Sequence, residues 1–254
     1  MTLAPGVLDR LRGARGFVFD LDGTLVLGDR NNAGLRALPG ALEFTNELAR
    51  RGTPFAILTN GTVRTPEQYA AKLRVLGFPV EDRSMLTPAS VAGEYLFKRG
   101  LRRVLVLGGE GSRAPLAAAG LTTLQPGEHR ADVDAIFIGW FREFALADLE
   151  IACEAAWGGA RLFAASLAPF YATAEGRALG TSRAIAAMIT SVTGRRATVL
   201  GKPSLQALRV AARRLGLACS TLAVVGDDPA LEVPMAHRGV QCGCVVNSPS
   251  TTPI

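Results

Sequence analysis

The sequence predicts an α/β protein built on a mainly parallel sheet. Short apolar runs alternate along the 254-residue chain with amphipathic segments of helical length, and strands separated by helices are typical of βαβ units. Several of these runs are followed at once by polar side chains. In open α/β sheets the carboxyl ends of the strands form the edge where ligands bind, so the same pattern predicts a functional site at that edge.

The predicted strands are short apolar runs, at residues 16–20, 54–59, 103–107, 134–138, 161–165, 197–201 and 222–226. The predicted helices are the amphipathic stretches near residues 40–51, 66–76, 88–99, 145–157, 182–193, 203–215 and 230–237. Thr65-Pro66-Glu67-Gln68 supplies an N-cap, a first-turn proline and a capping-box glutamine, and Thr87-Pro88 repeats the first two features. Glycines stand where helices should end, at Gly52, Gly77, Gly100 and Gly216.

Composition and charge narrow the class of protein. With 48% hydrophobic and 20% charged residues, the chain is typical of a soluble globular protein with a sizeable core. The net charge of +6 comes mainly from scattered arginine pairs, so we expect anionic small molecules rather than nucleic acid as partners. No signal peptide and no apolar stretch long enough to span a bilayer is present, which predicts a cytoplasmic protein without membrane contact.

Cysteine and histidine residues indicate no metal or triad chemistry. Cys242 and Cys244 could form half of a soft-metal site, but no second pair or nearby histidine accompanies them, so reduced thiols are the favoured interpretation. Cys153 and Cys219 form no spaced framework with this pair. The two histidines, His129 and His237, have no visible triad partner.

Polar groups follow four apolar runs in a fixed order. The stretch GFVFDLDGTLV ends a strand with Asp20 and places Asp22 two positions later. Thr59-Asn60-Gly61, Gly201-Lys202-Pro203 and Gly226-Asp227-Asp228 follow three later runs. Each motif alone is weak, because strands commonly end in such residues. Together they offer carboxylates, a hydroxyl, an amide and an ammonium group.

This set of groups suits phosphoryl transfer. Carboxylates alone would repel a phosphate dianion, so a divalent cation must lie between them, and hard oxygen ligands favour Mg²⁺. A carboxylate can attack phosphorus, while the metal and the lysine offset the charge of the transition state. A second carboxyl group can protonate the leaving oxygen and then activate water.

The motifs Asp20-Leu21-Asp22-Gly23-Thr24-Leu25, Leu58-Thr59-Asn60-Gly61, Gly201-Lys202-Pro203-Ser204 and Gly226-Asp227-Asp228 resemble those of haloacid dehalogenase superfamily hydrolases. The similarity is to subfamily IIA, the branch of NagD-like and p-nitrophenyl phosphatases. Pro39-Gly40-Ala41 also fits this branch, so the resemblance covers nearly the whole chain. It implies a doubly wound parallel-sheet core with an inserted α/β cap of the C2 type. We expect the core at residues 1–86 and 181–254 and the cap at 87–180.

The resemblance also implies a role for each motif residue. Asp20 would be the nucleophile and Asp22 the general acid and base. The phosphate would be held by Thr59, by Lys202 and by the amides of Asn60 and Gly61. Mg²⁺ would be bound by Asp20, by the main-chain oxygen of Asp22 and by Asp227. The implied activity is Mg²⁺-dependent hydrolysis of small phosphomonoesters through an aspartyl phosphate, in a homodimer formed through the cap.

Three segments depart from the family pattern. Glu232 stands where an aspartate is usual, so we expect it to reach the metal only through water, with Asp228 as a competing secondary ligand. Residues 28–34 form a longer flap beside the site, for which a functional role and a tolerated insertion are equally open. Residues 166–170, Ser-Leu-Ala-Pro-Phe, replace the Asn-Pro-Asp of relatives, so the substrate cannot be inferred from them.

Other functions stay open at this point. Gly109 to Ala114 follows a predicted strand and matches a dinucleotide fingerprint, but a tight turn of the cap is the favoured interpretation because the expected acidic residue is not well placed. A phosphometabolite-binding module with little turnover is a second alternative, and a phosphotransferase is a third.

Overall fold

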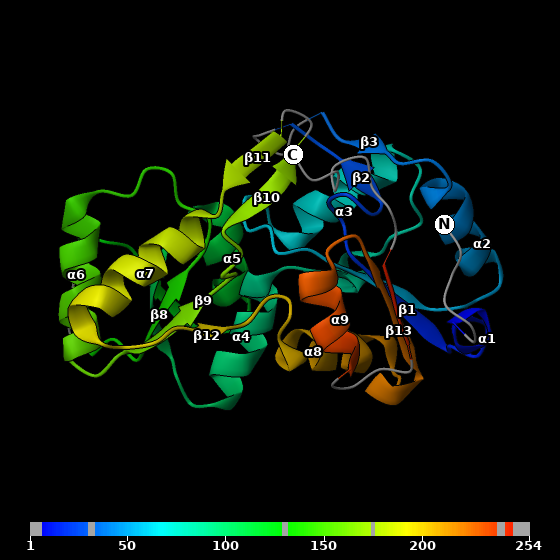
Figure 1. Cartoon of the computed structure of the whole chain (residues 1–254). Coiled ribbons are helices and arrows are strands. Elements are labelled where there is room, and N and C mark those ends of the chain that lie inside the picture. Colours follow the sequence, from blue (N-terminus) through cyan, green and yellow to red (C-terminus); the bar gives the residue numbers. More distant parts are fainter. Residues whose placement is uncertain (1–6, 30–33, 129–131, 174–175, 238–241, 246–254) are drawn as a thin grey trace.

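The computed structural model describes residues 7–29, 34–128, 132–173, 176–237 and 242–245. Two parallel sheets form its framework, which confirms the predicted fold class (Figure 1). The first sheet joins, from edge to edge, β14 (Cys242–Val245), β13 (Leu222–Gly226), β1 (Gly16–Phe19), β4 (Phe55–Leu58) and β5 (Met85–Leu86). The second joins β12 (Thr198–Val199), β9 (Arg161–Ala164), β8 (Ala135–Ile138), β6 (Arg103–Leu107) and β7 (Thr122–Leu124).

Helices cover both sheets. They are α1 (Val7–Arg12), α2 (Ala41–Arg50), α3 (Pro66–Val75), α4 (Pro88–Lys98), α5 (Glu110–Ala118), α6 (Leu146–Trp157), α7 (Thr181–Thr193), α8 (Leu205–Leu215) and α9 (Pro229–His237), with 3-10 turns η1 (Asp82–Ser84) and η2 (Cys219–Thr221). Two antiparallel hairpins complete the described structure. One is β2 (Val26–Leu27) with β3 (Arg36–Ala37), and the other is β10 (Phe170–Thr173) with β11 (Gly176–Leu179).

Alternating side chains of the strands build the apolar core. In β1, Phe17 and Phe19 face one cluster together with α2 and α3, whereas Val18 faces another with α4 and α8. This second cluster continues onto the second sheet, where it includes Val104 and Phe137. The other face of the second sheet packs on α6 and α7. One apolar cluster therefore runs through both sheets.

The helix starts that the sequence signals are confirmed. Thr65 accepts a hydrogen bond from the N–H of Gln68, and the Gln68 side chain accepts one from the N–H of Thr65. Thr87 and Ser90 make the same reciprocal pair at the start of α4. The glycines expected to end helices all have left-handed backbone angles, with φ of 66° at Gly52, 96° at Gly77, 74° at Gly100 and 66° at Gly216.

Two elements beyond residue 180 belong to the second sheet layer. The strand predicted at residues 197–201 forms as β12, but it pairs with β9 instead of joining the sheet that holds β1. Helix α7, also beyond residue 180, packs on the same layer through Ile185 and Ile189. We propose on this basis that the inserted unit extends to about residue 199 rather than ending at residue 180.

In Figure 1 the first sheet and its helices lie on the right, and the second lies on the left with α6 and α7 outermost. The hairpin of β10 and β11 extends from the second unit over the edge of the first. Within the described ranges, no helix has both the length and the apolar character needed to cross a membrane.

Candidate active site

Three neighbouring strands bring the predicted motifs together. β1 pairs with β13 on one side and β4 on the other, all in parallel register. Asp20 directly follows β1, Thr59 directly follows β4, and Asp227 directly follows β13. Because the three carboxyl ends lie at one edge, the topology itself gathers these side chains. All three are buried, and only Asp20 and Asp227 retain a few per cent of exposed surface.

Lys202 lies at the centre of the buried charges. Its Nζ atom is 2.5 Å from Oδ1 of Asp20 and 2.8 Å from Oε1 of Glu232. Lys202 is 3% exposed and Glu232 is 0% exposed. Ion pairs this deeply buried are strong only when their geometry is well satisfied. The ammonium group is thus fixed beside the predicted nucleophile by a second carboxylate behind it.

Glu232 uses both of its carboxylate oxygens within the protein. While Oε1 bonds Lys202, Oε2 accepts a hydrogen bond of 3.0 Å from the N–H of Asp228. The carboxylate lies against Gly226, where the β-carbon of any other residue would collide with its Cγ and Cδ atoms. This arrangement supports an interaction with the lysine rather than the water-mediated metal contact that the sequence suggested. Asp228, the other secondary candidate, accepts a hydrogen bond of 2.9 Å from the N–H of Ala230 at the start of α9.

Asp227 and Asp20 form a second close pair. The Asp227 carboxyl group hydrogen-bonds Asp20, and burial together with the Asp20 charge raises the pKa of Asp227 to about 8. Gly23, with φ of 86°, leaves the space that the Asp227 carboxylate occupies. Two carboxylates this close repel when both are ionised, so they bind a proton or a cation between them.

Asp22 is held by the second motif. Its Oδ2 accepts a hydrogen bond of 3.0 Å from Oγ1 of Thr59, and the same hydroxyl accepts one of 2.9 Å from the N–H of Gly61. Burial, followed by the charge of Asp20, raises the pKa of Asp22 to about 6. A carboxyl group with such a pKa can both donate and accept a proton near neutral pH.

The pKa of Lys202 is raised by its neighbours, in spite of its burial. Burial alone would lower its pKa, but the negative charges of Asp20 and Glu232 outweigh burial and raise the pKa above its usual value. These neighbouring carboxylates favour the ammonium form of the lysine, which provides a positive charge beside Asp20.

Asn60 joins three separate segments of the chain. Its Oδ1 accepts a hydrogen bond of 2.7 Å from the N–H of Lys202, and its Nδ2 donates to the main-chain oxygen of Lys202 at 3.2 Å. The same Nδ2 lies 3.3 Å from Oγ of Ser166 in the altered cap loop. Sequence reasoning assigned Asn60 only a main-chain amide for phosphate, and missed that its side chain positions Lys202.

The donor set fits a magnesium ion. Asp20 and Asp227 offer two adjacent carboxylates. Asp22, two residues after Asp20, could add its main-chain oxygen as a further ligand. No group of three or more His, Cys, Asp or Glu side chains has metal-binding geometry in the described part of the chain. A site with few protein carboxylates and several waters is what Mg²⁺ prefers. Thr24 follows Asp22 by two residues, and its buried Oγ1 atom has no hydrogen-bond partner in the described part of the chain.

The cap closes over the loop that follows β4. The N–H of Trp140 donates a hydrogen bond of 2.7 Å to Oγ1 of Thr62, and Gly111 at the start of α5 packs on the main chain of residues 62–64. A β-carbon at Gly111 would lie 2.5 Å from the Thr62 carbonyl oxygen. Gly111 of the dinucleotide-like motif therefore serves close packing, and the core covers this part of the helix start at which a pyrophosphate would have to bind.

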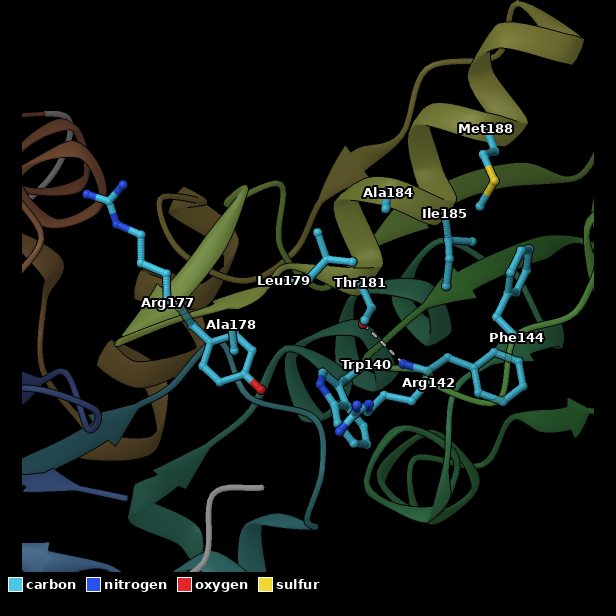
Figure 2. A pocket seen from close by; sticks show the side chains of 12 residues that line it. Trp140, Arg142, Phe144, Arg177, Ala178, Leu179, Thr181, Ala184, Ile185 and Met188 are labelled. Atoms are coloured by element: carbon cyan, nitrogen blue, oxygen red, sulfur yellow. Dashed lines mark hydrogen bonds between the residues drawn. The ribbon is translucent and has the colours of Figure 1, made fainter. Parts of the chain in front are cut away.

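A cavity of about 430 Å³ opens on the cap between α7 and the hairpin of β10 and β11 (Figure 2). Aromatic side chains and two arginines, Arg142 and Arg177, are among its lining residues. Trp140 lines this cavity, and its N–H is the group that donates to Thr62 in the loop that follows β4. The cavity therefore adjoins the core near the loop that follows β4.

Among the described residues, His237 and Cys153 take no part in this site. His237 is exposed at the end of α9, and Cys153 is buried in the apolar cluster under α6. His129, most of the flap at 28–34, and the side chains of Cys242 and Cys244 lie outside the described residues.

Comparison with known proteins identifies relatives over almost the full chain. The family described as haloacid dehalogenase-like hydrolase matches residues 17–122. Mouse chronophin is 30% identical over 244 residues, which cover 92% of this chain and 80% of chronophin. The 5'-nucleotidase YutF of Bacillus subtilis is 28% identical over 220 residues, which cover 86% of this chain and 81% of YutF.

Solved structures agree with these sequence matches. A 4-nitrophenylphosphatase from Thermotoga maritima superposes with a TM-score of 0.83 at 27% identity, covering 97% of this chain and 90% of that one. NagD from Escherichia coli superposes with a TM-score of 0.79 at 23% identity, covering 95% of this chain and 93% of that one. The second likeness concerns the fold alone, and it includes both the core and the cap.

Proposed function

The chain belongs to the haloacid dehalogenase-like hydrolases and is a phosphatase of that family. From this premise we propose that it hydrolyses small phosphomonoesters through a phosphorylated Asp20. The observation that carries the proposal is the buried contact of 2.5 Å between Lys202 and Asp20, at the strand end that also holds Asp22 and Asp227. A nucleophilic carboxylate, an adjacent acid and a fixed cation are what transfer of a phosphoryl group to the protein requires.

In the first step an Asp20 oxygen attacks phosphorus and the bond to the leaving oxygen breaks. Asp22 donates its proton to that oxygen, so that the leaving group departs as an alcohol. The hydroxyl of Thr59 and the N–H of Gly61 orient Asp22 for this transfer. Lys202 offsets the negative charge that develops on the phosphoryl oxygens.

In the second step water attacks the phosphorus of the acyl phosphate. Asp22, now a carboxylate, accepts a proton from this water, and the bond between phosphorus and Asp20 breaks to release inorganic phosphate. Asp20 and Asp22 return to their starting states. The raised pKa of Asp22, about 6, supports both of its roles because neither protonation state is strongly disfavoured near neutral pH.

Asp20, Asp227 and the main-chain oxygen of Asp22 would hold Mg²⁺. When bound, the ion neutralises the paired carboxylates and polarises a phosphoryl oxygen. Its support here is the close pair of Asp20 and Asp227, which burial makes unfavourable in the doubly ionised form. Glu232 and Asp228 take no direct part, because their carboxylates bond Lys202 and the start of α9.

The test is hydrolysis of p-nitrophenyl phosphate and of a panel of sugar, nucleoside and short-chain phosphate esters, with Mg²⁺ and with excess chelator. We expect metal-dependent release of phosphate by the wild type, and none by Asp20→Asn. Asp22→Asn should accumulate little product, because the leaving oxygen of an alkyl ester receives no proton and, for every ester, the water of the second step has no base. Absence of metal-dependent turnover on the whole panel contradicts the proposal. Tight ligand binding without turnover would instead favour a regulatory module, and transfer to added alcohols would favour a phosphotransferase.

A homodimer through the cap accompanies this proposal. Large apolar side chains are exposed on α6, α7 and β11, at Leu146, Leu179, Met188 and Val192. Exposed apolar groups gathered on one unit are typical of interaction surfaces. Sedimentation analysis of the wild type and of Met188→Glu, which we expect to weaken the dimer, would test it.

A further inference from the structure

Arg64 is a cation that the described structure leaves partly unsatisfied. It lies in the loop between β4 and α3, where the cap covers the main chain. The β-carbon position of Gly111 is only 2.6 Å from the N atom of Arg64. The Nη1 atom is inaccessible to water and has no hydrogen-bond partner among the described residues, and Arg64 forms no ion pair with them. A buried donor without a partner costs free energy that a ligand can recover.

The surroundings of Arg64 place it on the Asp22 side of the site. Its Cζ atom is 5.7 Å from the ring centre of Tyr69, whose phenol also engages the guanidinium but leaves Nη1 free. The Tyr69 hydroxyl lies 2.5 Å from the β-carbon position of Gly61, and the N–H of Gly61 bonds the same Thr59 hydroxyl that holds Asp22. The charge of Arg64 also lowers the pKa of Asp22, against burial and the Asp20 charge that raise it.

Position relative to Asp22 decides which part of a substrate Arg64 can reach. Lys202 serves the phosphoryl group from the Asp20 side, where it is within 2.5 Å of the nucleophile. Asp22 protonates the leaving oxygen in the proposed reaction, so side chains beyond Asp22 face the leaving group. Arg64 is therefore placed for the leaving group rather than for the phosphoryl group.

The adjoining cap surface favours an anionic leaving group. The cavity that Tyr171 helps to line contains Arg142 and Arg177, but no carboxylate is among its lining residues. Figure 2 shows Arg177 extending from β11 away from the apolar side chains of the cavity. The lining of this cavity thus contains positive charge and no acid.

We propose that Arg64 binds an anionic group carried by the leaving group, so that the preferred substrates are phosphomonoesters with a second acidic group close to the ester oxygen. This inference rests on the proposed phosphatase function. A guanidinium binds carboxylate or phosphate oxygens in a planar, paired geometry, and such charge-assisted bonds are about twice as strong as neutral ones. The second anion would complete the hydrogen bonding of Nη1.

The experiment compares two matched series of substrates. One consists of ω-carboxyalkyl phosphates of increasing chain length, and the other of their primary carboxamides, which have the same shape and no second charge. For the wild type we expect kcat/KM to favour the acid at least about tenfold at one chain length, as expected of one charge-assisted pair. In Arg64→Gln the preference should fall to about one, because kcat/KM falls more for the acids than for the amides. The control is Arg99→Gln, which removes the same charge at the exposed end of α4, where the guanidinium lies over Tyr95.

Each result bears on the proposal. A wild type that hydrolyses acids and amides equally at every chain length overturns it while leaving the phosphatase function intact, and this comparison needs no folded variant. An equal loss on both series in Arg64→Gln would place Arg64 on the phosphoryl group and overturn it too. An equal fall of the preference in Arg99→Gln would attribute selectivity to overall charge. If no ester of either series is hydrolysed, the proposed function itself fails.

Discussion

Replacing Glu232 by glutamine tests whether this residue positions the lysine or supports the metal. Glutamine has nearly the same shape, and its amide oxygen can still accept one of the two hydrogen bonds that Glu232 accepts. The substitution removes a negative charge that lies 2.8 Å from Nζ of Lys202, at a side chain that is fully buried. Asp20 then carries the only negative charge in contact with the ammonium group among the described residues, so the lysine is drawn toward Asp20 and makes it a poorer nucleophile.

The size of the effect follows from this geometry. Removing one partner of a fully buried ion pair costs about 3–5 kcal/mol. Because Lys202 keeps Asp20 and the glutamine keeps a hydrogen bond, we expect about 2 kcal/mol for Glu232→Gln and the full cost for Glu232→Ala. For a chain of this size, about 2 kcal/mol lowers Tm by about 4–8 °C. We expect kcat to fall about 10- to 100-fold, less than the roughly 100- to 1,000-fold loss caused by removing one transition-state donor, because Lys202 itself remains.

Three measurements distinguish the two roles of Glu232. Thermal unfolding reports the stability, hydrolysis of p-nitrophenyl phosphate reports kcat, and a Mg²⁺ titration reports the concentration for half-maximal activity. A lysine-positioning residue lowers kcat and Tm but leaves the Mg²⁺ requirement within about threefold. The control is Asp228→Asn, because asparagine caps a helix as well as aspartate and the pair of Lys202 and Glu232 is untouched. Unchanged kcat and Tm in Glu232→Gln, or a change confined to the Mg²⁺ requirement, would refute the reasoning.

Three further predictions concern the same buried cluster. Because the pKa of Asp227 is raised to about 8, the metal-free protein should lose stability as the pH rises from about 4 through 8. Mg²⁺ should therefore raise Tm more at pH 8 than at pH 6. A gain in Tm that does not depend on pH would contradict this. Gly226→Ala should lower the free energy of unfolding by more than about 2 kcal/mol, measured by chemical denaturation, because the new methyl group collides with Glu232. In a Glu232→Ala background the same substitution should cost much less. Additive losses of the two substitutions would show that no such contact exists. Asn60→Ala leaves a main-chain N–H of the lysine loop unsatisfied and should cost about 2 kcal/mol and lower kcat, and an unaltered denaturation midpoint would count against it.

The sequence predicted the strand ends well and the partners of the charged groups less well. Asp20, Thr59 and Asp227 follow apolar runs that form neighbouring strands, and such runs are visible without any structure. The run ending at Leu200 looked the same, yet its strand joins the other sheet. Parallel strands buried on both faces have one pattern whichever sheet they enter, so the sequence alone could not assign it.

Helix α5, strand β7 and the hairpin of β10 and β11 were not predicted from the sequence. Helix α5 begins in a glycine-rich stretch and contains Pro115, both of which normally argue against a helix. Strand β7 and the hairpin of β10 and β11 have no continuous apolar run, unlike the equally short β1 and β4 that the sequence predicted. Such elements are stabilised by their neighbours rather than by their own propensity.

The role of Glu232 depended on space that a sequence does not display. Glu232 follows Asp227 at the spacing of a metal-binding acid, and that spacing suggested the metal. The backbone of Gly226 instead leaves room for the longer side chain beside it, so its carboxylate reaches Lys202, 30 residues earlier in the chain. Contact between such distant groups is fixed by the packing of α9 on β13, which no local pattern reports.

Charge balance connects the proposed chemistry with the proposed selectivity. The buried cluster contains the carboxylates of Asp20, Asp22, Asp227 and Glu232 but the single ammonium of Lys202. Even with a divalent cation bound, an ionised cluster would remain negative and would repel a phosphate dianion. Protonation of Asp22 removes one of these charges, which is also the state the first step needs. A substrate with a further anionic group adds repulsion that only another cation can offset, and Arg64 is a cation beside Asp22 with a donor to spare. If Arg64 were replaced by glutamine, that repulsion would return for acidic substrates alone, so loss of selectivity should grow as ionic strength is lowered.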